Sequence, residues 1–461
     1  MLKPSYRLST WSIRLPWADW GWAHWFIVCQ FVLQLLLLFS QFGVLRVWMR
    51  TISFLISLGL VLWLPGPGIK HPAKGAAIAI VAIMVLQLFL NPGLNTFPAG
   101  LAQCAMYLAI LGPLFWASRL KINTAGFYAL IWLLWAFHTV SSLFGILQVY
   151  NPGRFQPFLS TAIQESKFGG ENLKITLANG LEVYRPMGLT GEPGGAAIAG
   201  FYALLLGIGI ALQARNPLLR LVGLGSAAIG LFCIYLSQIR SILIFAIVCL
   251  LILGIVLLRQ GKVLQVAVMG TAVGVLFASV FNWAVAVGGN QTMERVMTLF
   301  ADTPQAVYQQ NRGGFLTYTF QTLLLDYPMG AGLGRWGPIS GYFGINNNPE
   351  TRPIWVEIQL TGWLIDGGIL LIIAYAVALY FTCQVAWRLA NNQQLGELAF
   401  WAGLIFAYDI GAIVITFNYP LFISQGGMEF WLLNSCLFVA GYKSWLQLSP
   451  FPVQKQLRQR S

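Results

Sequence analysis

Charged residues are scarce in this 461-residue chain: Asp, Glu, Lys and Arg together make up 9% of it, against about 25% in ordinary soluble domains. Hydrophobic residues make up 57%. A soluble protein of this composition would lack the polar side chains needed to cover its surface. The composition excludes a disordered chain, a fibre and an ordinary water-soluble domain, and it predicts a polytopic membrane protein.

Several chemical signatures are also missing. The six cysteines lie singly inside apolar runs, without a CxxC pair or a metal-ligand spacing. The three histidines, His24, His71 and His138, are far apart along the chain and form no metal set. There is no P-loop, no Gly-x-Ser-x-Gly elbow and no DxD-type metal motif in an outer loop. We therefore expect neither a metal nor a cofactor.

The few charges are unbalanced, since 27 Lys and Arg stand against 14 Asp and Glu, for a net charge of +13. Nucleic-acid-binding proteins carry such a surplus as a patch or stripe. Here the basic residues are scattered singly between apolar runs, so the sequence argues against nucleic acid as a partner.

Apolar runs recur along the whole chain, and a helix needs about 20 apolar residues to cross the hydrocarbon core. We predict an all-α transmembrane helical bundle of about 12 spans, forming a single domain over residues 1–461. The second and third spans are short, and the tenth is too long for a straight crossing. The predicted spans are Trp25–Val44, Thr51–Leu64, Ala76–Leu90, Phe97–Ser118, Thr124–Val149, Gly194–Leu212, Leu218–Leu236, Ser241–Leu258, Val263–Val287, Trp355–Trp387, Leu398–Thr416 and Leu421–Trp445.

The basic residues between these spans predict their direction, because cytoplasmic loops are enriched in Lys and Arg. If both termini are cytoplasmic, short basic connections such as Arg119–Lys121, Arg215–Arg220 and Arg259–Lys262 all lie inside. Arg46 and Arg50, in the first outer loop, are the exception. The same orientation places these terminal residues inside: Lys3, Arg7, Arg14, Lys455, Arg458 and Arg460.

Two outer loops, residues 150–193 and 288–354, are much longer than the other connections, and loops of this length are usually functional or fold on themselves. In the second, Asp302-Thr303-Pro304 is typical of a helix start. We expect Gly313-Gly314 to break that helix and Phe315–Leu325 to form an amphipathic one. This loop therefore predicts a helical cap on the outer face before span ten.

Polar residues that can carry chemistry gather at the outer ends of the spans. Arg240 stands in a turn so tight that it must lie at the membrane boundary, and an arginine there is a functional hypothesis by default. Its structural alternative is a partner such as Glu192 or Asp409, whereas Arg185 can equally well reach lipid phosphate by snorkelling. The candidates are Tyr184, Arg185, Glu192, Arg240, Arg312, Arg335, Arg352 and Glu357.

Three other polar residues lie within predicted spans. Asp409 and Glu429 are costly in the membrane unless they are paired or hydrated. We expect them either to pair with the outer arginines or to mark a proton path. For His138 we expect a packing role.

The chain has arginines on its outer face but no nucleotide- or metal-binding motif. Such arginines are well suited to binding a lipid-linked diphosphate. Arginine presents a rigid, always charged fork that binds phosphate oxygens bidentately. Two or three such residues would neutralise a diphosphate leaving group without a divalent metal. A nearby carboxylate would then take the proton from an attacking hydroxyl.

At these residues the chain resembles the O-antigen ligase and polymerase superfamily of bacterial envelope proteins. Arg185-Pro186-x-Gly188 resembles the family's first arginine motif, and Ser237–Ser241 its second. The stretch from Arg312 to Gly332 is similar to its arginine, helix, proline and Gly-x-Gly element. Asp366-Gly367-Gly368 is similar to its acid followed by glycine. The resemblance covers residues 184–380.

One position departs from the family pattern. The family commonly has a histidine about eleven residues before the final glycine, and counting back from Gly368 reaches Glu357. A carboxylate also serves as a general base, so Glu357 is the candidate for that role.

The resemblance implies a metal-independent glycosyltransferase that moves a glycan from a polyprenyl-diphosphate donor to an acceptor hydroxyl at the outer leaflet, as a polymerase or a ligase. It implies that Arg185 and Arg240 hold the diphosphate and that Glu357 activates the acceptor. Further substrate contacts would come from Tyr184, Glu192, Arg312, Arg335 and Arg352. The implied partners are the donor, a glycan, lipid or protein acceptor, membrane lipids and, as further candidates, other polysaccharide assembly proteins. The implied location is the bacterial inner membrane, with the active site facing the periplasm.

Two other classes of function stay open. A transporter of a small anion or inorganic carbon would line its path with the same arginines. Transporters often contain paired repeats and helices broken at the membrane midplane, and the sequence shows neither. The third class is a scaffold without chemistry inside an envelope export complex.

Overall fold

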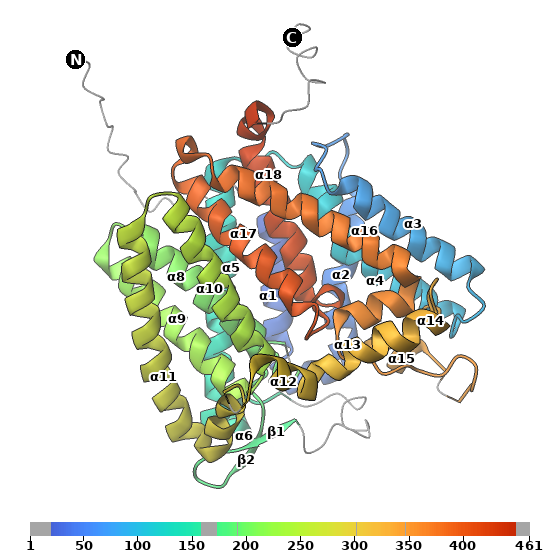
Figure 1. Ribbon diagram of the computed structural model, residues 1–461, viewed down its shortest axis with the longest axis horizontal. Helices are drawn as coiled ribbons and strands as arrows, with labels where there is room; N and C mark the ends of the chain where they lie inside the picture. Colours follow the sequence, from blue (N-terminus) through green and yellow to red (C-terminus); the bar gives the residue numbers. More distant parts are fainter. Residues whose placement is uncertain (1–19, 158–172, 191, 301, 346, 449–461) are drawn as a thin grey trace, which may run out of the picture.

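The computed structural model describes residues 20–157, 173–190, 192–300, 302–345 and 347–448. The terminal basic residues that entered the orientation argument (Lys3, Arg7, Arg14, Lys455, Arg458 and Arg460) lie outside these ranges. Within them the chain is almost entirely helical (Figure 1). The long helices are α1 (Trp22–Leu36), α2 (Arg46–Trp63), α3 (Lys74–Leu90), α4 (Phe97–Trp116), α5 (Thr124–Tyr150), α8 (Ala196–Gln213), α9 (Pro217–Ser237), α10 (Arg240–Arg259), α11 (Val263–Met297), α16 (Gln359–Ala390), α17 (Glu397–Ile415) and α18 (Gln425–Leu448).

The all-α helical bundle is confirmed. Among the described residues, eight helices are long and apolar enough to cross a membrane, namely α4, α5, α8, α9, α10, α11, α16 and α17. Helices α1, α2 and α3 are apolar but shorter. The sequence indicates this for the second and third spans, whereas the predicted end of the first span at Val44 is wrong, because α1 ends at Leu36 and a 3₁₀ helix, Ser40–Leu45, follows it. Helix α18 has 24 residues and carries Glu429 and Asn434. A multi-pass membrane protein fits these helices, and the count of 12 spans stays a prediction.

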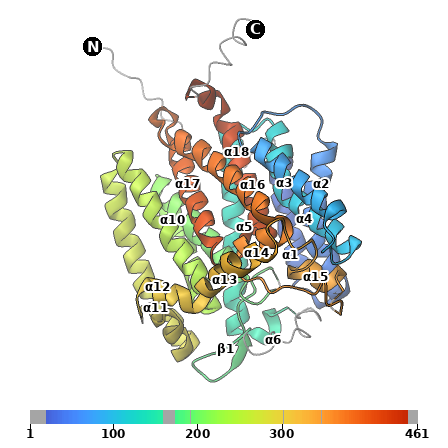
Figure 2. The ribbon, with the colours of Figure 1, turned by 45° about the vertical axis from the view of Figure 1, so that its right-hand side comes forward.

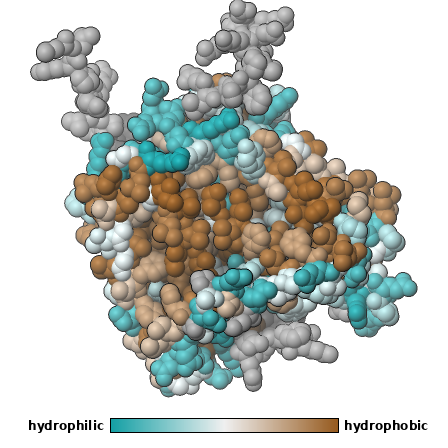
Figure 3. Space-filling view, viewed as in Figure 1, coloured by the Kyte–Doolittle hydropathy of each residue, from teal (hydrophilic) through white to brown (hydrophobic). Residues whose placement is uncertain are grey.

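The bundle has two chemically different ends. Helix α1 begins and α18 ends at one end, here called the basic end (Figures 1 and 2). The chain segments that end there include Arg119, Arg259 and, between α8 and α9, Arg215. The opposite end, here called the cap end, carries the short helices before α16 and a β-hairpin. Between the two ends a hydrophobic band crosses the visible face, with polar surface on either side of it (Figure 3). This distribution is the one expected of a protein that lies across a bilayer.

Small residues allow some helices to approach closely. A Cβ atom added to Gly200 of α8 would lie 2.4 Å from the carbonyl oxygen of Gly230 in α9, and one added to Gly207 would lie 2.6 Å from that of Gly223. Only glycine fits such a crossing, and small residues serve the same purpose in many membrane helix pairs. Helix α9 of this close pair leads directly into the tight turn before α10.

Helix α11 changes direction at Gly289, which has φ +64°. The sequence placed the start of an outer loop at residue 288, but the chain stays helical for two more turns, to Met297. The β-hairpin, β1 (Lys174–Thr176) and β2 (Glu182–Tyr184), docks against this bend. The Ala178 N–H donates to the Val287 carbonyl (3.0 Å), which fixes the hairpin to the helix.

The predicted helical cap is present at the cap end. Thr303 caps α12 (Pro304–Tyr308), as the sequence indicates, and the chain continues through α13 (Gly314–Tyr318) to α14 (Leu324–Asp326), with π-helical turns between them. The expected break at Gly313-Gly314 is wrong, since both residues have helical dihedral angles (φ −63° and −57°). A further short helix, α15 (Gly337–Phe343), precedes α16.

Helix α16 is interrupted at Gly367 and Gly368, where Gly368 has φ +65°. The glycine-rich segment 328–334 of the cap fills the interruption. The Ala331 N–H donates to the Ile365 carbonyl (2.8 Å), and the Ile369 N–H donates to the Pro328 carbonyl (3.0 Å). We found no broken helix in the sequence, and the interruption of α16 corrects that interpretation. The break is tolerated because the cap segment pairs with backbone groups that an intact helix would satisfy internally.

Candidate functional site

A cavity of about 370 Å³ lies at the cap end, between the β-hairpin and the neighbouring ends of α9, α10 and α11. Four of its lining side chains are cationic and one is acidic, which makes the site strongly positive. The lining residues are Lys174, Arg185, Gln238, Arg240, Gln291, Glu294, Arg295 and Thr298.

Two local features of the backbone bring these side chains together. The α9–α10 turn passes through Gln238, the one non-glycine residue with positive φ among those described (+54°), and this left-handed residue lets α10 begin at Arg240. On the other side, Arg185 follows β2 and its N–H donates to the Leu173 carbonyl (2.9 Å). The bend at Gly289 supplies the third wall.

That third wall is the end of α11. Gln291, Glu294, Arg295 and Thr298 follow one another at the spacing i, i+3, i+4, i+7, which places them on one face of a helix. Sequence reasoning missed these residues, because it assigned the segment to a loop. Their helical spacing is the signal that could have identified them.

Arg240 is held at the cavity by α11. Its Nη1 donates to Thr298 Oγ1 (2.7 Å), and that hydroxyl in turn donates to the Arg295 carbonyl (2.8 Å). The two acids considered as its structural partners have other contacts. Glu192 forms an ion pair with Arg50 (3.1 Å), and Asp409 accepts a hydrogen bond from Asn434 (2.8 Å).

The cations of this site repel one another. Burial lowers the pKa of the Arg185 guanidinium, and neighbouring Arg295 lowers it further. Burial likewise lowers the pKa of Arg312, and Arg240 adds to this shift. The Nε of Arg185 is buried and has no hydrogen-bond partner among the described residues. A bound anion would relieve the repulsion and accept a hydrogen bond from the Arg185 Nε.

Arg312 also contacts Glu357. The two side chains form an ion pair that joins the cap to the segment before α16. Trp355 Nε1 donates to Glu357 Oε1 (2.9 Å). The candidate base is therefore paired with an arginine that is itself repelled by Arg240, and neither Arg312 nor Glu357 lines the cavity.

Two other predicted substrate contacts do not line the cavity. Arg335 is buried, and its guanidinium donates to the carbonyls of Ala331 (2.9 Å) and Arg352 (3.2 Å). These hydrogen bonds hold the cap segment in place. The Arg352 side chain is exposed.

Tyr184 and Glu192 also do not line the cavity. The Lys174 ammonium lies 5.9 Å from the centre of the Tyr184 ring. The Glu192–Arg50 ion pair ties the loop before α8 to α2, which explains why Arg50, an exception to the charge pattern, lies at this end.

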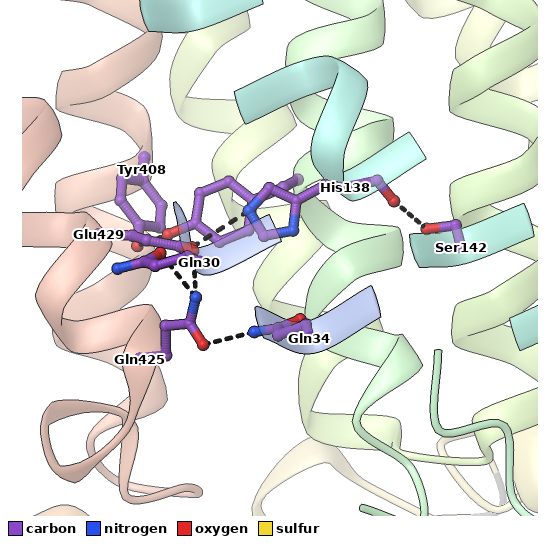
Figure 4. Close-up of polar contacts among 8 residues, drawn as sticks. Gln30, Gln34, His138, Ser142, Tyr408, Gln425 and Glu429 are labelled. Atoms are coloured by element: carbon purple, nitrogen blue, oxygen red, sulfur yellow. Dashed lines mark hydrogen bonds and ion pairs between the residues drawn. The ribbon is translucent and has the colours of Figure 1, made fainter. Parts of the chain in front are cut away.

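A second polar cluster lies inside the bundle (Figure 4). His138 Nε2 and Glu429 Oε2 are 3.1 Å apart, and the Gln425 side chain bridges Glu429 (3.4 Å) to Gln30 (2.7 Å). Gln34 donates to Gln425 (2.5 Å). Glu429 therefore pairs with His138 and not with the outer arginines. Because α1, α5 and α18 all contribute, this cluster joins three helices through hydrogen bonds in apolar surroundings.

Comparison with known proteins adds no assignment. Neither a protein-family model nor a curated protein matches this chain.

Proposed function

We propose that this protein is a metal-independent membrane glycosyltransferase of the polysaccharide polymerase or ligase type. Its donor would be a glycan on a polyprenyl diphosphate, and its acceptor a hydroxyl at the outer leaflet. The observation that supports this proposal is the cavity holding Lys174, Arg185, Arg240 and Arg295. Its volume of about 370 Å³ falls within the range of small-molecule sites, about 300–1,000 Å³. A diphosphate with an attached sugar is a ligand of that size and charge.

The neighbouring helix supports a lipid-bound donor. Helix α11 contributes the third wall of the cavity, and only 11% of its most apolar stretch is buried inside the protein. A polyprenyl chain could lie along this apolar surface within the bilayer while its diphosphate enters the cavity from the side.

In the proposed reaction, the acceptor oxygen attacks the anomeric carbon and the bond from that carbon to the diphosphate oxygen breaks. The polyprenyl diphosphate departs with the bonding electrons, and Arg185, Arg240 and Arg295 stabilise its added negative charge. The acceptor proton passes to the Glu357 carboxylate once Arg312 turns from Glu357 to the diphosphate. Attack from the face opposite the leaving group inverts the anomeric configuration.

The placement we propose is the bacterial inner membrane, with both termini in the cytoplasm and the cavity facing the periplasm. The basic end carries the short Lys- and Arg-containing connections, as expected of a cytoplasmic face. Arg185, Arg240 and Arg295 lie at the opposite end, where such residues are unusual unless they serve a site.

The decisive experiment replaces Arg240 with alanine in cells whose lipid-linked glycans are analysed. A strain lacking the protein should accumulate single lipid-linked repeats if it is a polymerase, and completed polymer if it is a ligase. Arg240→Ala should reproduce that accumulation, whereas Arg352→Ala, at an exposed arginine outside the cavity, should not. Normal glycans in a strain whose Arg240→Ala protein is inserted at normal levels would contradict the proposal.

One observation favours the rival function, transport of a small anion or inorganic carbon. Helix α16 is broken at Gly367 and Gly368, as helices often are at transporter binding sites. The cationic residues nevertheless gather at one end of the bundle, where a through-path would need them along its length. Loss of anion uptake by vesicles containing the Arg240→Ala protein, with glycans unchanged, would favour the transporter.

A further inference from the structure

A stripe of polar side chains on α11 lines the cationic cavity beside its arginines. Gln291, Glu294 and Thr298 are spaced i, i+3 and i+7, so they lie on one face of the helix. At one end of the stripe, Gln291 Oε1 accepts a hydrogen bond from the Thr176 N–H of β1 (3.0 Å). At the other end, Thr298 Oγ1 accepts one from Arg240 Nη1 (2.7 Å). Glu294 therefore lies in the middle of a wall that is attached both to the hairpin and to α10.

The carboxylate of Glu294 is unused by the protein. Four cationic residues line the same cavity, yet among the described residues Glu294 takes part in no ion pair and its side chain accepts no hydrogen bond. Lys174, which also lines the cavity, pairs instead with Glu182 (3.6 Å). The two oxygens of Glu294 therefore keep their acceptor positions for a ligand.

Gln238 offers the complementary kind of contact. It occupies the left-handed turn between α9 and α10, is 8% exposed and lines the cavity. Its Nε2 has no hydrogen-bond acceptor among the described residues, although buried amides nearly always have one. A hydroxyl group both donates and accepts hydrogen bonds. An unused carboxylate and an unused amide N–H in one cavity together suit a ligand that carries hydroxyl groups.

A site built only for phosphate would gain nothing from Glu294. A carboxylate opposes a bound anion, because its charge weakens the positive potential of the cavity. A structural role would require Glu294 to neutralise one of the neighbouring arginines, and it forms no such pair among the described residues. The acid is therefore better explained by the group that accompanies the phosphate.

We propose that Glu294 and Gln238 bind the sugar that is joined to the diphosphate, and that Glu294 restricts the donor to sugars without a negative charge. This assignment rests on the proposed function, which makes a glycan diphosphate the ligand of the cavity. The hydroxyl groups of a neutral sugar donate to the carboxylate. A uronic acid in the same place sets two carboxylates against each other, and such like-charge repulsion is a usual means of rejecting a wrong ligand.

The first test compares two phosphate monoesters of the same charge, glucose 1-phosphate and methyl phosphate, by calorimetry with the purified full-length protein. The wild-type protein should bind glucose 1-phosphate about tenfold more tightly, as expected for one hydrogen bond to a charged group. Glu294→Ala should remove this advantage without weakening the binding of methyl phosphate. Glu350→Ala, the same change at an exposed acid outside the cavity wall, should preserve it.

The second test concerns the charge of the sugar. Glucuronic acid 1-phosphate should bind the wild-type protein about tenfold more weakly than glucose 1-phosphate, because its carboxylate meets that of Glu294. Glu294→Gln keeps the size of the side chain and removes its charge, so it should reduce this difference to about twofold. An unchanged difference in the Glu294→Gln protein would overturn the proposed selection against charged sugars.

Pyrophosphate binding separates a failure of this proposal from a failure of the proposed function. If the wild-type protein binds pyrophosphate but binds glucose 1-phosphate no more tightly than methyl phosphate, the sugar subsite is overturned and the diphosphate site stands. If the wild-type protein does not bind pyrophosphate, the diphosphate site and the sugar subsite are both overturned.

Discussion

The guanidinium of Arg312 contacts the carboxylate of Glu357 and is also repelled by the guanidinium of Arg240, which lines the cationic cavity. One arginine is thus placed between a candidate base and a candidate diphosphate site. In the proposed reaction, an anion in the cavity would compete with Glu357 for this arginine. Anion binding and release of the carboxylate are therefore coupled in the proposed reaction.

This coupling predicts opposite effects of Glu357→Gln on binding and on transfer. Without its ion pair, Arg312 is freer to contact an anion, so affinity for pyrophosphate should rise about threefold, as expected for a partly exposed pair. Glycan transfer should fall about 100-fold or more, because the base is lost. Calorimetry with the purified protein and analysis of lipid-linked glycans measure the two effects. Glu350→Gln, at an exposed acid, is the control, and weaker pyrophosphate binding by Glu357→Gln would refute the coupling.

Arg295 was not among the sequence candidates, but it lines the cavity beside Arg185. We expect Arg295→Ala to reduce pyrophosphate affinity about tenfold, the usual loss for one charge-assisted contact. The effect should shrink at high salt, since exposed charges are screened. Arg352→Ala should change the affinity little. Equal pyrophosphate affinities of the Arg295→Ala and wild-type proteins at low salt would show that Arg295 does not contact the anion.

The bend of α11 can be tested with two glycines of the same helix. Gly289→Ala places a side chain at φ +64°, 3.2 Å from the Ala178 Cα, and should destabilise the protein by about 1–2 kcal/mol while displacing the third wall. Gly270→Ala is the matched control, because its Cβ meets nothing within 4 Å and alanine favours a helix. The Gly289→Ala protein should therefore unfold at a lower temperature and bind pyrophosphate more weakly than the Gly270→Ala protein. Similar behaviour of both would show that the bend does not position the site.

Arg335 provides a contrast with the cavity arginines. Arg335→Met should loosen the cap, because the hydrogen bonds to the Ala331 and Arg352 carbonyls are lost. Hydrogen–deuterium exchange of residues 331–345 should therefore rise severalfold. Pyrophosphate affinity should stay within about twofold of wild type, since exposed phosphate contacts are not removed. A large loss of pyrophosphate affinity with unchanged hydrogen–deuterium exchange would show that Arg335 contacts the anion after all.

His71, between α2 and α3, makes stability depend on pH. Burial lowers its pKa from 6.5 to about 3, so the folded protein keeps the ring neutral where the unfolded chain takes up a proton. The contribution of His71 to the free energy of unfolding is complete above pH 6.5, and it is lost as the pH falls towards about 3. Within this window the free energy of unfolding should change with pH by up to about 1.4 kcal/mol per pH unit. His71→Gln should flatten the dependence of the free energy of unfolding on pH over this window. An unchanged slope would show that other groups control it.

Much of this architecture follows from local patterns. Apolar runs of membrane-spanning length indicate the helices, because each run must satisfy its own backbone in lipid. Thr303 before Pro304 marks the start of a cap helix, and Pro328 marks its end, through hydrogen bonding that involves only neighbouring residues. Arg185 and Arg240 were singled out because arginine is unusual at an outer boundary, and the structure brings both into one cavity.

Only the tertiary structure decided which other residues lie in the cavity with Arg185 and Arg240. Arg295 reaches the cavity because a single positive φ at Gly289 redirects two helical turns, and Lys174 arrives on a hairpin docked to that bend. Arg335 has the same chemistry as the cavity arginines, yet it is turned inward by two backbone carbonyls. The break in α16 exists because a distant glycine segment supplies its hydrogen bonds. Hydropathy and spacing report on neighbours along the chain, whereas these contacts depend on how the helices pack, which no local pattern encodes.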